Sequence, residues 1–400
     1  MINQKNKELG MHSSCIRQLF EYGKKRKQEI GEENVFDFSI GNPSVATPEF
    51  VTKKLIEIIN NTDPVKLHGY TSASGDINVK NKIVNYLNYK YNASLEAKYM
   101  YMTCGAAASL TITLNAILND KDEVIIFAPY FPEYKVFIEQ AKGKVVIVNP
   151  VKETMLPNLN EFKNLINENT KAVIINSPNN PTGVVYNEEL ILEISSILKE
   201  KSNVFKKSIY LISDEPYREL IFEDIKYPFI TNYYDDSIVC YSFSKSLSLP
   251  GERIGYIVLS SCMNEAEEVY YSICGAGRAL GYVCAPSLFQ QLVAECLGIT
   301  SDINIYQENR DILYRELTSY GYEVIKPSGA FYLFVKALGN SSNDFSEFAK
   351  KYELLLVPSD SFGYKGFVRI SYCVSKEQII KSLPQFKKLY DDFKKGVNYE

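Results

Sequence analysis

Short apolar runs alternate with amphipathic stretches over most of the chain, and this alternation limits the folds that the chain can adopt. The runs lie at residues 35–40, 123–127, 144–148, 172–176, 209–213, 238–242 and 253–259. Between two of them, one stretch carries apolar side chains at helical spacing, at Leu190, Ile191, Ile194, Ile197 and Leu198. Strands that alternate with helices favour a mostly parallel sheet that is covered by helices on both faces.

The pattern changes after Pro286. A long helical region is expected at residues 287–320, followed by strands at 331–335 and 367–370 and by a closing helix. The chain is therefore expected to be an α/β protein with two domains. Residues 46–285 would form the large domain, a mostly parallel seven-stranded sheet sandwiched by helices. Residues 286–400 would form a smaller α+β domain, to which residues 1–45 contribute as an N-terminal arm.

Composition excludes several classes of protein. The 44 basic and 48 acidic side chains leave a net charge of −4, which disfavours a nucleic-acid partner. The 8 cysteines form no C-x-x-C pair and only 2 histidines are present, so no metal site is expected. No apolar stretch reaches membrane-spanning length, and the N-terminus carries no apolar signal segment. We expect a soluble, cytoplasmic protein.

Three of the expected strands end in unusual polar segments. The first segment, residues 176–183, presents Asn180 between two prolines. The second, residues 213–217, contains Asp214 and Tyr217, and the third, residues 242–255, contains Lys245 and Arg253. Taken singly, these residues could be a turn, a helix cap and surface charges. In open α/β sheets, however, ligands bind beyond the carboxyl ends of the strands, where all three segments would meet.

Together the three segments suit one kind of chemistry. A lysine can form a covalent bond with an aldehyde cofactor, and pyridoxal phosphate also needs an acid beside its ring nitrogen and a site for its phosphate. The order and spacing of the segments resemble those of the class I/II aminotransferases, which are pyridoxal-phosphate enzymes of fold type I. The resemblance covers nearly the whole chain and is nearest to bacterial members that are labelled aspartate aminotransferase.

The resemblance implies a catalytic role for Lys245, Asp214 and Tyr217. Lys245 matches the lysine that holds the cofactor's aldehyde and then moves a proton during the reaction. Asp214 matches the acid that pairs with the ring nitrogen of the cofactor, which keeps the ring protonated. Asn180 and Tyr217 match the two donors to the phenolate oxygen of the cofactor.

The resemblance also implies how the cofactor is held. Ser242, Arg253 and the backbone of Gly105, Ala106 and Ala107 match the phosphate site; the last three residues open an expected helix, whose N-terminus attracts anions. Phe131 matches the aromatic residue that stacks on the cofactor ring. Tyr70 matches a tyrosine that reaches the phosphate of a neighbouring subunit, which implies a homodimer with shared active sites.

The substrates implied are an L-amino acid and a 2-oxo acid, which would react in turn by a ping-pong mechanism. Arg369 matches the arginine that binds the substrate α-carboxylate, since a guanidinium suits a carboxylate in bidentate geometry. Gly41 matches a turn that approaches the same carboxylate, and Asn180 lies beside it. Aspartate is a candidate donor and would need a second cation in the site, for which Arg17 and Arg278 are the candidates.

Three alternative functions can be compared with these residues. A carbon–sulfur β-lyase on the same scaffold would use the same lysine, acid and arginine and therefore stays open. A regulator with an added DNA-binding domain is disfavoured by the negative charge and by the short segment before the first expected core strand. The glycines of residues 275–281 have the spacing G-x-G-x-x-x-G after an expected helix, which does not fit a dinucleotide-binding turn.

Overall fold

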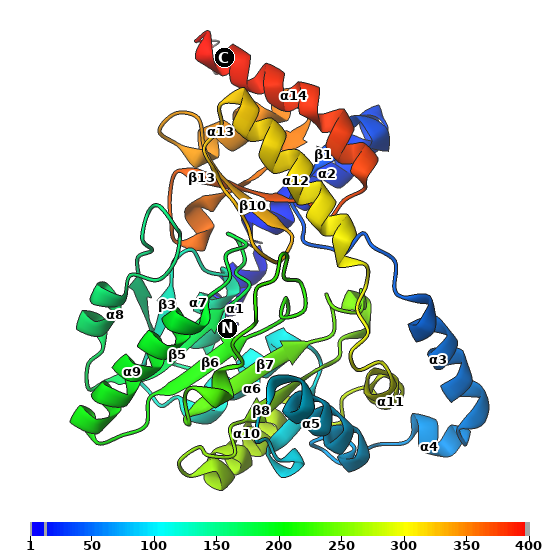
Figure 1. The fold of residues 1–400 in the computed structure, drawn as a ribbon, viewed down its shortest axis with the longest axis vertical. Helices are drawn as coiled ribbons and strands as arrows, with labels where there is room; N and C mark the ends of the chain where they lie inside the picture. The colour runs from blue at the N-terminus through cyan, green and yellow to red at the C-terminus, as the bar shows by residue number, and fades with distance from the viewer. Residues whose placement is uncertain (1, 12–13, 397–400) are drawn as a thin grey trace.

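The computed structural model, in which residues 2–11 and 14–396 are described, has a seven-stranded sheet at its centre (Figure 1). The strand order is β2–β8–β7–β6–β5–β3–β4. The strands span Met100–Thr103 (β2), Glu123–Phe127 (β3), Lys144–Val148 (β4), Thr170–Asn176 (β5), Tyr210–Asp214 (β6), Ser237–Ser242 (β7) and Gly255–Leu259 (β8). Only β8 runs antiparallel to its neighbours, β2 and β7. The expected α/β fold with a mostly parallel seven-stranded sheet is confirmed.

Both faces of this sheet are buried, because successive side chains of a strand point to opposite faces. Ile125 packs on one face with α5 (Ile77–Tyr91), α8 (Leu159–Leu165), α9 (Glu188–Phe205) and α11 (Ser287–Glu295). Its neighbour Ile126 packs on the other face with α6 (Ala106–Ile117), α7 (Glu133–Gln140) and α10 (Ala266–Leu280). The three-layer arrangement leaves the strand ends as the places where polar side chains can gather.

A second core lies above the large sheet in Figure 1. Its four-stranded sheet has the order β12–β13–β10–β9, with bounds Val357–Pro358, Phe367–Ser371, Tyr332–Lys336 and Val324–Ile325. Three helices pack around it: α12 (Ile303–Tyr320), α13 (Ser342–Ala349) and α14 (Lys376–Lys394). The N-terminal strand β1 (Phe36–Asp37) pairs with β11 (Leu354–Leu355), so both ends of the chain build this smaller α+β domain.

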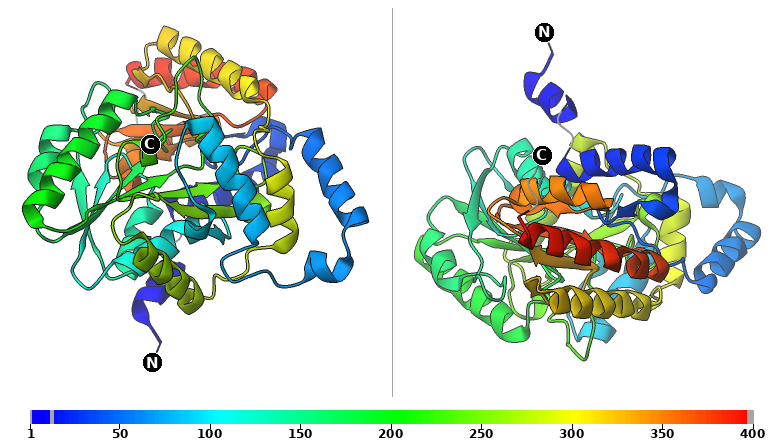
Figure 2. Two further views of the ribbon diagram at one scale, coloured as in Figure 1. Left: turned by 60° about the horizontal axis from the view of Figure 1, so that its bottom comes forward. Right: turned by 90° about the horizontal axis from the view of Figure 1, so that it is seen from above.

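Four N-terminal helices lie outside these layers or at their edges. Helix α2 (Cys15–Ile30) packs beside the smaller domain, whereas α1 (Gln4–Met11) extends away from the rest of the molecule (Figure 2). Helices α3 (Glu49–Asn61) and α4 (Pro64–His68) form an arm at the outer edge of the large domain (Figure 1). Among the described residues, no helix combines the length and the apolar character that a membrane crossing requires.

Two sequence-based expectations about elements differ from the structure. The run at residues 35–40 forms only the two-residue strand β1, because it pairs with β11 of the smaller domain and not with the large sheet. The helical region expected at residues 287–320 is divided into α11 and α12. Gly298 lies between them at a φ of 81°, and the Asp302 side chain caps the start of α12. The domain boundaries at residues 45 and 285 stay predictions.

Candidate active site

The expected site residues gather at one edge of the large sheet. Strands β5, β6 and β7 are parallel neighbours, so their carboxyl ends, at Asn176, Asp214 and Ser242, lie side by side. Strand β8 is antiparallel to β7 and to β2, and Gly255 at its start pairs with both Ser242 and Thr103. The start of β8 and the turn that leads from β2 into α6 therefore reach the same edge.

A cavity of about 290 Å³ opens at this edge. It is lined from the large domain, the smaller domain and the N-terminal segment, by Ile16, Ile40, Gly41, Ala106, Ala107, Leu110, Phe131, Asn176, Asn180, Asp214, Pro216, Tyr217, Ser242, Ser244, Lys245, Pro250, Arg253, Tyr332 and Arg369. All the expected site residues except Gly105 and Tyr70 are among them.

Lys245 enters the cavity from the loop after β7. Its Nζ donates a hydrogen bond to the carbonyl oxygen of Gly41 at 2.7 Å and lies 5.5 Å from the centre of the Phe331 ring. No carboxylate of the described residues forms an ion pair with this amine. Burial lowers the pKa of Lys245 to about 8, so roughly a tenth of the amine is uncharged at pH 7, and this fraction can act as a nucleophile or a base.

Asp214 lies at the end of β6, and only one of its two carboxylate oxygens accepts a hydrogen bond. The hydroxyl of Tyr134 donates a hydrogen bond to Oδ2, whereas Oδ1 is buried without a hydrogen-bond partner. Burial raises the pKa of this carboxyl from 3.8 to about 7. A buried acceptor of this kind costs free energy unless a ligand supplies a donor or a positive charge.

The raised pKa of Asp214 predicts a pH-dependent stability of the cofactor-free protein. The protonated carboxyl favours folding below its unfolded pKa near 4, and this contribution is lost as the pH rises through about 7. The full loss is on the order of 4 kcal/mol. The Tm of Asp214→Asn should therefore exceed that of the wild type by a margin that widens from pH 5 to pH 8. Thermal melts at both pH values test this, and a margin independent of pH would contradict it.

Arg369 is a buried cation in which one N–H group, that of Nε, has no hydrogen-bond partner. It lies on β13 with 1% of its surface exposed, and its Nη1 donates to Asn180 Oδ1 at 3.0 Å while Nη2 donates to the carbonyl of Ser39. Its Nε has no partner, and no acidic side chain of the described residues pairs with it. Burial lowers the pKa of the guanidinium. An unpaired buried charge of this kind is suited to binding a carboxylate from outside the chain.

The part of the cavity that is lined by α6, Ser242 and Arg253 is suited to binding an anion. The first turn of α6 brings the backbone amides of Ala106 and Ala107 to the wall. Ser242 and Ser244 face the same space, with their hydroxyl oxygens 2.6 Å apart. Arg253 lines the same cavity, and a Cβ on Gly105 would come within 2.9 Å of its Nη2. Gly105 therefore allows Arg253 to lie close to the helix start.

These features fit pyridoxal phosphate. The unpaired Oδ1 of Asp214 suits a protonated ring nitrogen, and the Phe131 ring can lie against a flat aromatic group. The anion site at α6 suits a phosphate dianion, and Lys245 offers an amine for the aldehyde. Gly41 would direct a Cβ against the Tyr332 hydroxyl, so only glycine leaves the Gly41 backbone open toward Lys245.

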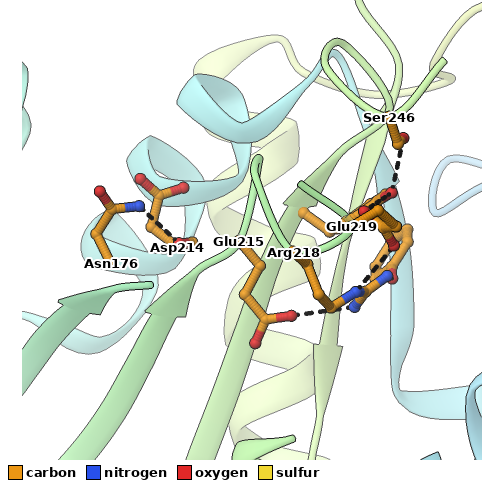
Figure 3. Close-up of polar contacts among 8 residues, drawn as sticks. Asn176, Asp214, Glu215, Arg218, Glu219 and Ser246 are labelled. Carbon is orange, nitrogen blue, oxygen red and sulfur yellow. Dashed lines mark hydrogen bonds and ion pairs between the residues drawn. The ribbon is translucent and has the colours of Figure 1, made fainter. Parts of the chain in front are cut away.

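A buried ion cluster lies behind the site (Figure 3). Arg218 donates to Glu215 Oε2 at 3.0 Å and to Glu219 Oε1 at 3.1 Å, and its guanidinium lies 4.1 Å from the centre of the Tyr241 ring. The Tyr241 hydroxyl in turn donates to Glu219 and lies 2.9 Å from the hydroxyl oxygen of Ser246. This chain of contacts runs from the residue after Asp214 to the residue after Lys245 and holds the two loops together.

Several residues of the cavity were not identified from the sequence. Tyr134 donates to Asp214, and the Tyr332 and Tyr217 hydroxyl oxygens lie 2.7 Å apart. Among 30 tyrosines, only the folded contacts distinguish these from core residues. Ile16 and Leu110 come from helices whose approach to the cavity no local motif indicates. Of the expected residues, Tyr70 does not line the cavity of its own chain, and 98% of its surface is exposed.

Comparison with known proteins gives a consistent result. Residues 33–383 match the family model for aminotransferase class I and II. The aspartate aminotransferase of Pyrococcus horikoshii is 31% identical over 386 residues, which cover 94% of each chain. A crystal structure of an aminotransferase from Eubacterium rectale shares 51% identity, with a TM-score of 0.96 over 98% of this chain and 99% of that one.

An aspartate aminotransferase of known structure from Thermotoga maritima is more distant, with 27% identity and a TM-score of 0.86. It covers 98% of this chain and all of its own, so the similarity extends over both domains. The cavity at the sheet edge, with its buried lysine, acid and arginine, agrees with the chemistry of these proteins. The chain thus belongs to the class I and II aminotransferases, which use pyridoxal 5′-phosphate to move amino groups.

Proposed function

We propose that this aminotransferase transfers the amino group of an L-amino acid to a 2-oxo acid with Lys245 as its central catalytic residue. The observation that carries the proposal is the meeting, in one cavity, of three ionisable groups that form no ion pair within the described part of the chain. They are the amine of Lys245, whose pKa is lowered to about 8, the unpaired Oδ1 of Asp214 and the buried guanidinium of Arg369. The two substrates react in turn and share the same site.

When bound, pyridoxal phosphate supplies an aldehyde carbon that takes an amine and a protonated ring that withdraws electrons from the Cα–H bond. In the loaded enzyme, Lys245 would serve as the base that accepts the proton from the substrate Cα, and its protonated amine would then serve as the acid that gives the proton back. Its lowered pKa supports this role, because an amine that titrates near 8 can both accept and release a proton at neutral pH.

Asp214, Asn180 and Tyr217 hold the cofactor ring. The free Oδ1 of Asp214 would accept from the ring nitrogen, and a carboxylate there would favour the protonated, electron-withdrawing ring. The amide of Asn180 and the hydroxyl of Tyr217 would donate to the phenolate oxygen, and Phe131 would offer an aromatic surface to the ring. Tyr134 keeps the Asp214 carboxylate in place through its hydrogen bond to Oδ2.

The phosphate is bound by Ser242, by Arg253 and by the backbone amides of Ala106 and Ala107 beyond Gly105. The start of a 12-residue helix and a guanidinium both favour a dianion. The substrate α-carboxylate binds to Arg369 at the other end of the cavity, where Asn180 and the Gly41 backbone lie beside the guanidinium. The phosphate site and Arg369 would therefore hold cofactor and substrate so that the substrate amine points toward Lys245.

Amino-group transfer can be tested by following the nitrogen atom of the donor amino acid. The purified holoenzyme would be incubated with single ¹⁵N-labelled amino acids and an excess of an unrelated 2-oxo acid. The proposal expects the label in the amino acid that corresponds to the added 2-oxo acid. Label that is released as ammonia, with none in a new amino acid, would favour the β-lyase alternative and contradict the transfer reaction.

We also propose that the enzyme is a homodimer in which each subunit contributes to its partner's site. Tyr70 supports this, because its side chain is 98% exposed and lies outside the cavity of its own chain. Three apolar side chains on the adjoining arm of α3 and α4 are also exposed, Ile56 by 55%, Ile59 by 48% and Val65 by 80%. A second copy of the chain would cover this arm and place Tyr70 beside the partner's phosphate site.

Mixing two variants tests the shared site. Tyr70→Phe should weaken cofactor binding by about 10-fold or more, through loss of one hydrogen bond to a charged group. A heterodimer with Lys245→Ala then contains one site with both Lys245 and Tyr70 intact. Pyridoxal-phosphate titration of the separated heterodimer should recover the wild-type affinity at that site. An affinity that stays at the level of Tyr70→Phe would show that Tyr70 does not act across the interface.

A further inference from the structure

The loop that carries Tyr70 is fixed on both sides of this residue. It connects α4 to α5 and lies against the first turn of α11. Before Tyr70, the carbonyl oxygen of Leu67 accepts a hydrogen bond of 2.6 Å from the Ser287 hydroxyl. After it, the hydroxyl oxygen of Thr71 accepts a hydrogen bond of 3.2 Å from the side chain of Gln290. Tyr70 itself is left exposed between two fixed points of the chain.

Gln290 holds two points of this loop with one side-chain amide. Its Nε2 donates to Thr71 and also to the carbonyl oxygen of Ala285 at 2.6 Å, and its Oε1 accepts from the backbone N–H of Asp76 at 2.9 Å. Asp76 in turn caps the start of α5. Gln290 is completely buried, so loss of its amide would leave buried groups without hydrogen bonds. The amide thus joins the residue after Tyr70 to the start of α5.

The backbone between these two points is also bound to neighbouring segments. The carbonyl oxygen of Ala73 accepts from the N–H of Cys284 at 3.0 Å, and that of Ser74 accepts from the N–H of Met102, on β2, at 2.9 Å. Gly75 has a φ of 103°, and a Cβ there would clash with the Met102 side chain. Only glycine therefore allows the loop to lie this close to β2.

We propose that Gln290 is a positioning residue for Tyr70, and through it for the cofactor phosphate of the partner subunit. The inference rests on the shared site proposed above. Gln290 is not among the described residues that line the cavity, so its effect on cofactor binding passes through the loop. A loop held at Leu67, Thr71 and Asp76 restricts the directions in which the tyrosine can point. This restriction lowers the entropy cost of a hydrogen bond across the interface.

A double-variant experiment tests whether Gln290 acts through Tyr70. Gln290→Met keeps the length of the side chain but removes the amide. It should weaken binding of pyridoxal phosphate to the dimer by about 5-fold, because a less ordered loop loses part of the contribution of Tyr70. In the Tyr70→Phe background, it should weaken binding by less than about twofold, because the hydrogen bond that it supports is already absent. Equal effects in both backgrounds would overturn the proposal.

Mixed dimers show which of the two sites depends on Gln290. In each dimer only one subunit keeps Lys245, so borohydride reduction at increasing concentrations of pyridoxal phosphate, read by mass spectrometry, reports the affinity of that site alone. The reference is a dimer of a wild-type chain and a Lys245→Ala chain.

The two arrangements of the substitutions give opposite expectations. With Gln290→Met and Lys245→Ala on separate chains, the site that keeps Lys245 receives Tyr70 from an unaltered loop and should match the reference. With both on one chain, paired with a wild-type chain, this site receives Tyr70 from the altered loop and should bind about 5-fold more weakly. The reverse order would show that Gln290 acts on the site of its own subunit and would contradict the proposal.

A matched control variant lies at the other end of α5. The side-chain amide of Asn88 also makes two hydrogen bonds to a loop, donating to the carbonyl oxygen of Leu95 and accepting from its N–H. Asn88→Leu should lower the Tm, as Gln290→Met does, but should keep the affinity for pyridoxal phosphate within about twofold of the wild type. If Asn88→Leu weakens cofactor binding as much as Gln290→Met, general loss of stability explains both effects and the positioning role is wrong.

Thr71 offers a test that does not depend on the folding of Gln290→Met. Thr71→Val keeps the shape of the side chain but removes the hydroxyl that Gln290 contacts, and it should weaken cofactor binding by about threefold. Thr71→Ser restores the hydroxyl and should restore the affinity. Equal affinities of these two variants would show that the contact has no part in cofactor binding.

Failure of this inference can be distinguished from failure of the shared site. If Tyr70→Phe has no effect across the interface in its mixed dimer with Lys245→Ala, the shared site is wrong and the role of Gln290 falls with it. If Tyr70 acts across the interface but Gln290→Met leaves cofactor binding unchanged, only the positioning role is overturned. Amino-group transfer by Lys245 stands in both cases.

Discussion

Replacing Lys245 by alanine is expected to abolish transamination. The variant loses both the amine that takes the aldehyde and the base that moves the Cα proton, and each role is worth at least about 100-fold in rate. Together they predict a fall in kcat/KM of more than about 10⁴-fold. Borohydride reduction adds a second measurement, because it should fix the cofactor covalently to the wild type and not to Lys245→Ala, as read by mass spectrometry.

Two control variants test whether the loss of activity is specific to the Lys245 amine. Lys142 is an exposed lysine in the turn between α7 and β4 and does not line the cavity, so Lys142→Ala should retain wild-type activity and covalent fixation. Lys245→Arg keeps a positive charge but cannot act as a base at neutral pH, so it should be as inactive as Lys245→Ala. Near wild-type turnover in purified, folded Lys245→Ala would remove this residue from the centre of the mechanism.

The second large effect is expected at Arg369. Arg369→Lys keeps the charge but cannot contact Asn180, Ser39 and a substrate carboxylate at once, because lysine lacks the planar fork of donors. Loss of charge-assisted hydrogen bonds of this kind should raise KM for the amino acid by about 10- to 100-fold. The affinity for pyridoxal phosphate should change by less than about threefold, and titrations with cofactor and with amino acid separate the two effects.

Arg253→Lys is the reciprocal control for this experiment. Arg253 lies at the anion end of the cavity, beside Gly105 and the start of α6. Its replacement should weaken cofactor binding more than amino-acid binding, the reverse of Arg369→Lys. If both arginine variants weaken cofactor and amino acid equally, neither residue can be assigned to one end of the site.

The large sheet follows closely from the sequence because it is buried on both faces. Its inner strands then become continuous apolar runs, and the expected run at 123–127 has the same bounds as β3. The expected run at 144–148 also has the bounds of β4, although β4 is an edge strand. The run at 35–40 is equally apolar but serves the smaller domain, where only Phe36 and Asp37 pair with another strand. Apolar character identifies a buried segment but not the core in which it is buried.

The site residues also divide into those that local sequence motifs indicate and those that only tertiary packing brings to the cavity. Asn180, Asp214 and Lys245 stand at strand ends with local turn signals, so the sequence indicates them and the parallel sheet brings them together. Tyr134, Ile16 and Leu110 lie on helices, and their contacts depend on how α7, α2 and α6 approach the cavity. This information resides in tertiary packing, and no local pattern carries it.

The absorbance spectrum of the purified protein with pyridoxal phosphate tests the central claim most directly. Amino acids would be added one at a time, and a 2-oxo acid would follow. If Lys245 holds the cofactor in an aminotransferase, the visible band of the resting enzyme should disappear with a good donor and return with the 2-oxo acid. A band that no amino acid removes, or one that is lost without return, would contradict amino-group transfer and point to a different reaction on this scaffold.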